Sequence, residues 1–169
     1  MKKLFFVVAL VVTVMVVPMI ASALDVVEPI GKGWEYTLGV GYKHFMKNSA
    51  GDAAYVGLRA QKRVQYPFLV GAGVEATAVG NVIAVDATIP VSIRLGIFDS
   101  LKIDALVAPG VAYAKNMETK VKQVLAVGTG GIEIKTFLKK GFSLGAGVYY
   151  TGYSRSEFNN IKAGLIIGF

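Results

Sequence analysis

The feature that most constrains this chain is an alternation of residue types with a period of two, which recurs from about residue 33 to residue 169. The alternating stretches are rich in Val, Ile, Tyr and Gly, and turn-forming residues interrupt them at 48–52, 80–81, 99–100 and 139–141. A period of two places successive side chains on opposite faces of a strand. The sequence therefore predicts an antiparallel, up-and-down meander of strands.

The meander divides into eight expected strands with short connections. They are expected at 33–46, 53–65, 68–79, 83–97, 101–114, 121–137, 141–153 and 158–169. All are longer than the about five or six residues of an ordinary strand in a soluble protein. Tilted strands that cross a bilayer need about 9 to 11 residues, so these lengths favour a membrane-spanning barrel.

Charge follows one parity of each expected strand. In the first strand Trp34 and Tyr36 share an apolar face, whereas Glu35 lies on the other. The polar parity of all strands together carries charges of both signs: Glu35, Lys43, Arg59, Arg63, Glu75, Asp86, Arg94, Lys102, Asp104, Glu133, Lys135 and Lys162. We interpret the apolar parity as a lipid-facing surface and the charged parity as a filled lumen. Opposite charges are expected to pair there, because a buried unpaired charge is costly.

Alternation alone also fits a soluble barrel with an apolar interior, so a soluble periplasmic lipid-binding barrel is the alternative. Composition favours the membrane, because 54% of the residues are hydrophobic and only 17% are charged. Aromatic residues at the expected strand ends form two girdles typical of bilayer interfaces. One girdle is expected from Trp34, Tyr36, Tyr66, Phe68, Phe98, Phe137, Phe142 and Phe169, and the other from Phe45, Tyr55, Tyr113, Tyr150, Tyr153 and Phe158.

The first residues have the pattern of an export signal. A basic start precedes an apolar stretch over 4–17, and Ala21 and Ala23 follow with the spacing of a signal peptidase site. We expect a cleaved signal peptide at 1–23 and a single barrel domain at 24–169. An uncleaved membrane anchor is the alternative, since the apolar stretch is close to the lower length limit of a spanning helix.

Composition also excludes several kinds of chemistry. The chain has no cysteine, which removes disulfides, thiol nucleophiles and thiolate metal sites. Its formal net charge is +7, but the basic residues are scattered singly, so nucleic acid is not expected as a partner. No metal and no cofactor are predicted.

The last expected strand alternates through Ile161, Ala163, Leu165 and Ile167 and ends in Phe169. With this strand, the export signal and the strand pattern, the chain resembles the small eight-stranded outer-membrane β-barrels of Gram-negative bacteria, of the OmpX type and the OmpA membrane domain. The resemblance implies an all-β, eight-stranded antiparallel transmembrane β-barrel in the cell outer membrane. It also implies that Phe169 is the signal recognised by the barrel-assembly machinery. The family often has another aromatic two residues earlier, where this chain has Ile167.

A lumen enclosed by eight strands is just wide enough for side chains, so an open pore is not expected. We predict a monomer with a structural or envelope-related role. Basic residues expected at one rim are candidates to bind lipopolysaccharide phosphates through charge-assisted hydrogen bonds. They are Lys47, Lys115, Lys120, Lys122 and Arg155. Ordinary solvated charge at a membrane edge is the alternative.

A lipid A-modifying enzyme is the alternative function, since some barrels of this size are acyltransferases or deacylases that use Ser, His and a carboxylate near the outer rim. Residues of these types occur at the same rim here: His44, Ser49, Asp52, Ser154, Ser156 and Glu157. The His-x-Ser-Asn type of signature found in the deacylases does not occur in the sequence. We therefore predict no catalytic residues.

Two prolines, Pro90 and Pro109, fall inside the fourth and fifth expected strands, nearly opposite each other across the turn at Asp99. Proline cannot donate a hydrogen bond to the ladder, so the pair predicts a bulge or a gap in the barrel wall. A bulge would help a tight barrel to curve. A gap would be a lateral opening through which a lipid chain reaches the lumen.

Overall fold

The computed structural model describes residues 33–46, 51–65, 67–138 and 142–169. The expected signal peptide lies outside these residues, as do Lys47, Ser49 and Tyr66. The strands are β1 Trp34–Phe45, β2 Asp52–Gln65, β3 Phe68–Val79, β4 Val82–Thr88, β5 Val91–Gly96, β6 Leu101–Asn116, β7 Lys122–Phe137, β8 Ser143–Tyr153 and β9 Asn160–Gly168, with a 3-10 turn, η2, at Ser156–Phe158. Within the described ranges no helix is long and apolar enough to cross a membrane.

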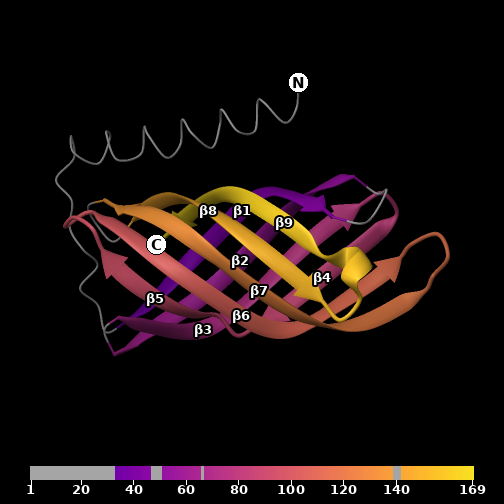
Figure 1. Cartoon of the computed structure of the whole chain (residues 1–169), viewed down its shortest axis with the longest axis horizontal. Helices are drawn as coiled ribbons and strands as arrows, with labels where there is room; N and C mark the ends of the chain where they lie inside the picture. Colours follow the sequence, from indigo (N-terminus) through magenta and orange to yellow (C-terminus); the bar gives the residue numbers. More distant parts are fainter. Residues whose placement is uncertain (1–32, 47–50, 66, 139–141) are drawn as a thin grey trace, which may run out of the picture.

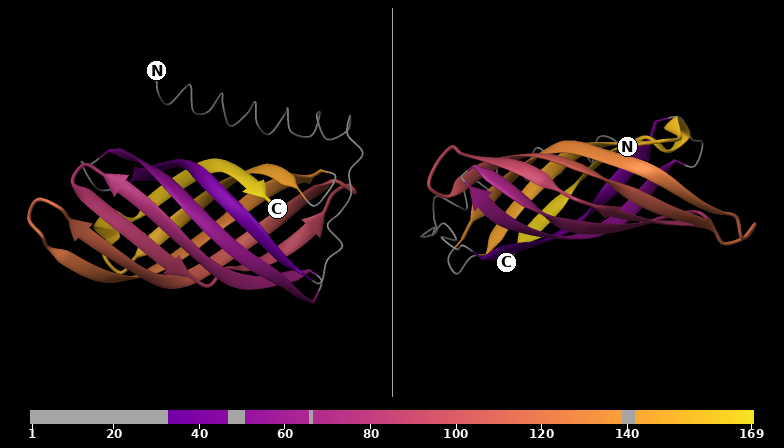
Figure 2. Two further views of the ribbon diagram at one scale, coloured as in Figure 1. Left: turned by 180° about the vertical axis from the view of Figure 1, so that it is seen from behind. Right: turned by 90° about the horizontal axis from the view of Figure 1, so that it is seen from below.

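The strands form one closed antiparallel sheet (Figures 1 and 2). β1 pairs with β2 on one side and with β9 on the other, so the first and last strands meet. β4 and β5 both pair with β3 and with β6, and they are therefore the two halves of a single wall strand. The predicted eight-stranded, up-and-down antiparallel barrel with short connections is confirmed.

Burial follows the parity that the sequence predicts. In β1, Trp34 and Tyr36 are exposed on the outside, while Thr37 and Lys43 are buried on the inside. Most outward positions of the other strands also carry exposed Val, Leu, Ile or aromatic side chains. The buried polar residues include Lys, Arg, Asp and Glu side chains from the inward positions. The barrel is thus apolar outside and charged inside, the reverse of a soluble barrel.

The two ends of the barrel differ. We call the end that carries Trp34 and Phe169 the C-terminal end, and the end that carries η2 and the β6–β7 hairpin the η2 end (Figure 1). At the C-terminal end the N–H of Tyr36 donates to the carbonyl of Phe169, and the N–H of Phe169 donates to the carbonyl of Tyr36, both at 2.9 Å. Their rings stack with centroids 6.2 Å apart. These contacts extend the β1–β9 seam to the last residue.

The predicted aromatic girdles are only partly formed. Trp34, Tyr36, Phe68, Phe98, Phe142 and Phe169 are exposed on the outside near the C-terminal end, and Tyr113 and Tyr150 are exposed nearer the η2 end. Tyr55 and Phe137 are buried inside, and Phe45, Tyr153 and Phe158 are partly buried. Assigning Tyr55, Tyr153, Phe137, Phe45 and Phe158 to the girdles was wrong, because proximity to a strand end does not fix the face. The first four occupy inward positions of their strands, and Phe45 and Phe158 line a cavity inside the lumen.

Pro90 interrupts the fourth wall strand without shifting its register. The assigned strand stops at Thr88 and resumes at Val91, yet Thr88 faces Gly110 and Val91 faces Val107, which is one continuous register. The two prolines do not face each other, since Pro90 is buried in the lumen and Pro109 is exposed outside. The predicted bulge is not formed here.

The wall also stays hydrogen-bonded around the prolines. The N–H of Ile89 donates to the carbonyl of Pro109 at 2.8 Å, and the N–H of Gly71 donates to the carbonyl of Pro90 at 3.0 Å. Each proline loses its donor but keeps its acceptor, so neighbouring strands remain attached on both sides. This geometry gives no support to a lateral opening at these residues.

The apolar outer surface predicts a depth-dependent response to charge. Replacing outward Val40, midway along β1, by Arg is expected to lower the free energy of unfolding by about 2–4 kcal/mol, because the guanidinium would face the centre of the bilayer. The matched change Met46→Arg, just past the end of β1, is expected to cost about 0–1 kcal/mol. Denaturant unfolding in lipid vesicles measures both values. Equal losses would contradict a lipid-facing band.

Candidate functional site in the barrel lumen

Charged and tyrosine side chains from all around the barrel meet inside the lumen in two clusters. The first, which we call the C-terminal cluster, consists of Glu35, Arg59, Arg94, Asp104, Glu133, Lys135 and Tyr149. The second, the η2 cluster, consists of Lys43, Glu75, Asp86, Tyr153 and Lys162. Their inward positions follow from the alternation of each strand.

Lys135 lies at the centre of the C-terminal cluster, and its side chain is fully buried. Its Nζ lies 2.9 Å from Glu133 Oε2, 3.1 Å from Asp104 Oδ2 and 3.4 Å from Glu35 Oε1. The three carboxylates come from β7, β6 and β1. One ammonium group therefore links strands that are not neighbours in the wall.

Arg94 completes this side of the cluster by binding two carboxylates at once. Its Nε and Nη2 donate to the two oxygens of Asp104, both at 2.7 Å. Its Nη1 and Nη2 donate to the two oxygens of Glu35 at 2.8 and 2.9 Å. The guanidinium also lies over the Phe137 ring, 4.9 Å from its centroid. The planar donor fork of Arg suits such paired contacts, whereas Lys offers only a point charge.

Arg59 reaches across the lumen to the same centre. Its Nη1 and Nη2 each donate to one oxygen of Glu133 at 2.6 Å, and the Tyr149 hydroxyl donates to Glu133 Oε1 at 2.7 Å. The C-terminal cluster thus pairs three carboxylates with three cationic side chains. Its formal charges cancel, which is the condition for burying ionised groups at tolerable cost.

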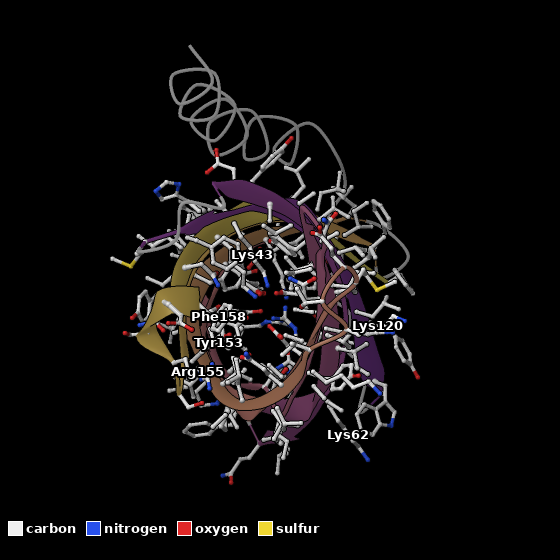
Figure 3. The ribbon with its side chains drawn as sticks, turned by 90° about the vertical axis from the view of Figure 1, so that its right-hand side faces the viewer. Lys43, Lys62, Lys120, Tyr153, Arg155 and Phe158 are labelled. Atoms are coloured by element: carbon white, nitrogen blue, oxygen red, sulfur yellow. The ribbon has the colours of Figure 1, made fainter. Side chains whose placement is uncertain are left out.

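The η2 cluster is smaller and also balanced. Lys43 Nζ lies 2.6 Å from Glu75 Oε1 and 3.7 Å from Asp86 Oδ2. Lys162 pairs with the other oxygen of Glu75, and the Tyr153 hydroxyl donates to Asp86 Oδ2 at 2.7 Å. Two carboxylates face two ammonium groups. Figure 3, a view along the barrel from the η2 end, shows Lys43 and Tyr153 inside the ring of strands.

Lys102, which the sequence analysis assigned to the lumen network, is buried near the C-terminal end. It is the direct cross-strand neighbour of Lys135 on β6 and β7. Of the other eleven predicted network residues, the structure brings ten together in the two clusters. The eleventh, Arg63 near the end of β2, is partly buried and lies outside the clusters as defined.

Sequence reasoning missed the tyrosines that fill the space beside the charges. The Tyr149 ring lies against the wall at Gly147, where a Cβ would sit 2.3 Å from the tyrosine oxygen. The Tyr55 hydroxyl similarly lies where a Cβ on Gly164 would come within 2.4 Å. These glycines make room for flat rings in a narrow lumen. The signal available in the sequence was the presence of glycines and tyrosines together on the inward parity.

The catalytic candidates are only partly assembled. His44 Nδ1 lies 2.7 Å from Asp52 Oδ1, with both side chains more than half exposed on the outside of the barrel. Ser154 is hydrogen-bonded through its backbone to β7, whereas His44 is on β1, with β9 and β8 between them. Glu157 lies 3.9 Å from Arg155. Among the described residues, no serine hydroxyl bonds to His44.

The basic rim residues lie at the η2 end, where the β6–β7 hairpin concentrates them. Lys115 and Lys122 are direct cross-strand partners on the outer face. Lys120 sits in the turn with a φ of 59°. Arg155 Nη1 donates to Gln123 at 3.3 Å, which fixes it beside the same hairpin. Like charges directly opposite on a sheet repel each other, so this cross-strand pair is unfavourable by itself.

Comparison with solved structures tests the fold independently. The chain is similar to the N-terminal β-barrel domain of Pseudomonas aeruginosa OprF, with a TM-score of 0.57 and 15% identity over 82% of this chain and 98% of that one. It is also similar to Ail, the attachment invasion locus protein of Yersinia pestis, with a TM-score of 0.56 and 10% identity over 82% and 97%. This chain has the fold of the small outer-membrane β-barrels. No protein-family model matches the sequence, and no curated protein matches it either.

The C-terminal cluster predicts a large cost for removing its central charge. Lys135→Met is expected to lower the free energy of unfolding by about 3–5 kcal/mol, because it removes the ammonium group that three buried carboxylates share. The matched change Lys122→Met, at an exposed position of the same strand, is expected to stay within about 0.5 kcal/mol. Denaturant unfolding of the refolded barrel measures both.

A double variant separates charge balance from packing. Glu133→Gln combined with Lys135→Met restores the balance of charge, so its loss should be smaller than the sum of the two single losses. Additive losses would contradict the electrostatic account.

Proposed function

We propose that this protein is a small integral outer-membrane β-barrel with a structural or envelope-related role, whose lumen is closed by side chains and does not conduct. The observation that carries the proposal is the pairing of an apolar outer surface with a charge-balanced interior. An apolar outer surface is compatible with the hydrocarbon of a bilayer. Charges inside the barrel have to balance only where side chains fill the lumen. The fold shared with the OprF and Ail barrels supports the same conclusion.

The clusters support closure of the lumen in two ways. Arg94 and Lys135 join β5 and β7 to carboxylates on β1 and β6, so side chains cross the interior. A solute that passed would have to separate these ion pairs while they remain buried, which leaves uncompensated charge behind. Each cluster is also formally neutral, so neither attracts a permeant ion, and the buried Lys102 adds one positive charge outside them.

The alternative functions receive less support. A soluble lipid-binding barrel would present charge outside and apolar side chains inside, whereas Val40, Leu58 and Leu165 are exposed here. A lipid A enzyme needs a nucleophile within reach of its base. His44 has an orienting carboxylate in Asp52, but neither Ser154 nor Ser156 meets it.

We infer that the η2 end faces the outside of the cell and that the C-terminal end faces the periplasm, where Phe169 serves as the assembly signal. The outward exposure of Phe169, with Leu165 and Ile161 exposed on the same face of β9, supports this role. A strand that presents one continuous apolar face is a suitable motif for a partner that recognises strands.

We also propose that lipopolysaccharide phosphates bind the basic rim at the η2 end. The opposed ammonium groups of Lys115 and Lys122 support it, because an anion between them would replace repulsion by attraction. Lys120 and Arg155 lie beside the same hairpin and extend the positive surface.

The first test concerns location and closure. The protein is expected in the outer-membrane fraction and should migrate differently on a gel before and after boiling, since membrane barrels stay folded in detergent. Liposomes that contain it should not swell in isotonic arabinose, because the clusters block the lumen. Swelling at a rate typical of a porin would contradict the closed lumen. Recovery only in the soluble periplasmic fraction would contradict the membrane location.

The second test concerns the rim. The double variant Lys115→Gln, Lys122→Gln is expected to be neutral or slightly stabilising in phosphatidylcholine vesicles, because it removes a repulsive cross-strand pair. In vesicles that contain lipopolysaccharide it should instead lower the free energy of unfolding by about 1–2 kcal/mol. Lys62→Gln, at the exposed C-terminal end, controls for the loss of a single lysine in phosphatidylcholine. The same sign of change in both lipids would argue against phosphate binding at this pair.

A further inference from the structure

At the η2 end, the lumen contains a cavity that the side chains of the η2 cluster do not fill. The cavity has a volume of about 110 Å³ and lies above the η2 cluster, with Lys43 on its lining. Phe158, the last residue of η2, packs with Tyr153 against the buried residues Ala112 and Leu125. In Figure 3 Phe158 and Tyr153 lie inside the ring of strands next to Lys43. We call this space the η2 cavity.

Apolar side chains form most of the walls of the η2 cavity. The lining residues come from seven elements around the barrel, and the apolar ones include Phe45, Val79, Val82, Ala84, Leu125 and Phe158. Such walls are unusual in a membrane barrel, whose interior is commonly polar. An apolar cavity also holds water poorly, because a water molecule needs two to four polar partners. The walls therefore suit the hydrocarbon part of a ligand.

One polar group on the lining is left without a partner. Thr77 is only 6% exposed, and its Oγ1 has no hydrogen-bond partner among the described residues. Threonine offers one donor and two acceptor sites, and burying them unused is destabilising. A hydroxyl or carbonyl on a bound molecule would satisfy this group.

The neighbouring charges restrict the ligand to an uncharged one. Lys43, the charged residue on the lining, is already paired with Glu75 and Asp86. Lys162 pairs with Glu75 as well, so two ammonium groups face the two carboxylates. A carboxylate or ammonium group on the ligand would therefore leave this neutral cluster with a net buried charge.

The volume of the η2 cavity limits the size of the ligand. A cavity of about 150 Å³ with apolar walls admits benzene. We propose that the η2 cavity binds an uncharged amphiphile of about five or six non-hydrogen atoms, such as a short primary alcohol, with its hydroxyl at Thr77 and its alkyl part against Val79, Val82 and Leu125. The site does not depend on which end of the barrel faces the outside of the cell, so it stands apart from the proposed function.

The test uses the folded barrel in lipid nanodiscs with labelled Leu and Val methyl groups and titrates it with 1-pentanol. The methyls of Val79, Val82 and Leu125 line the cavity, whereas those of Val85 and Val124 face the lipid. Saturable shifts are expected for the first set, while the second set should show only the gradual change caused by alcohol entering the lipid. Shifts of the same form in both sets would overturn the proposal.

Two variants examine the two parts of the site. Thr77→Val keeps the shape but removes the hydroxyl, and it should weaken pentanol binding roughly fivefold. Ala84→Phe fills the cavity and should abolish the saturable shifts, while Ala87→Phe on the outer face of the same strand should leave them intact. Gel mobility before boiling shows whether each variant is folded, and Thr77→Val decides the question if Ala84→Phe does not fold.

Charge selectivity completes the experiment. Pentanoate and pentylammonium match pentanol in length but carry a charge, and neither should produce saturable shifts at Val79, Val82 or Leu125. Equal binding of either ion would overturn the proposal, as would unchanged pentanol binding by both Thr77→Val and Ala84→Phe.

Discussion

Hydrogen bonds between β1 and β9 close the sheet, and the rest of the structure depends on this closure. An open sheet edge would leave backbone N–H and C=O groups without partners in hydrocarbon, so a spanning sheet has to close on itself. With eight strands, closure leaves an interior that only side chains can fill. The inward positions therefore have to satisfy one another, since little room remains for water to do so.

In this chain, most of the inward charged side chains satisfy one another in the two clusters. Each combines equal numbers of carboxylates and cationic groups, and in the C-terminal cluster Arg59 and Arg94 bind carboxylates through paired donors. The glycines opposite the tyrosine rings complete the packing, because they remove wall volume where the rings need it. The pairing of charges and the packing of side chains in the lumen thus depend on the same residues. A change at Gly147 would act on Glu133 through Tyr149, although it carries no charge itself.

The parity of the strands made the barrel, its apolar surface and the inward location of the charges predictable from sequence. Which charges meet was not predictable, because partners such as Arg59 and Glu133 are 74 residues apart and meet only through the tilt and stagger of the strands. The prolines show a related limit. Residue counting placed Pro90 nearly opposite Pro109, and the register does put them one residue apart, but their rings lie on opposite faces of the wall. The inward tyrosines could have been identified by applying parity to Tyr55 as strictly as to the charges.

The lumen is uneven along its length, and this bears on what the barrel can do. Its C-terminal half is occupied by ion pairs that link distant strands, while its η2 end has apolar walls and one unused hydroxyl. A conducting path would need a polar lining along its whole length. The apolar walls at the η2 end are unfavourable for such a path, and the ion pairs obstruct it at the C-terminal end. The same arrangement makes the η2 end a pocket with a polar, neutral floor, so the features that we propose close the lumen to solutes also define the proposed site for a small uncharged molecule.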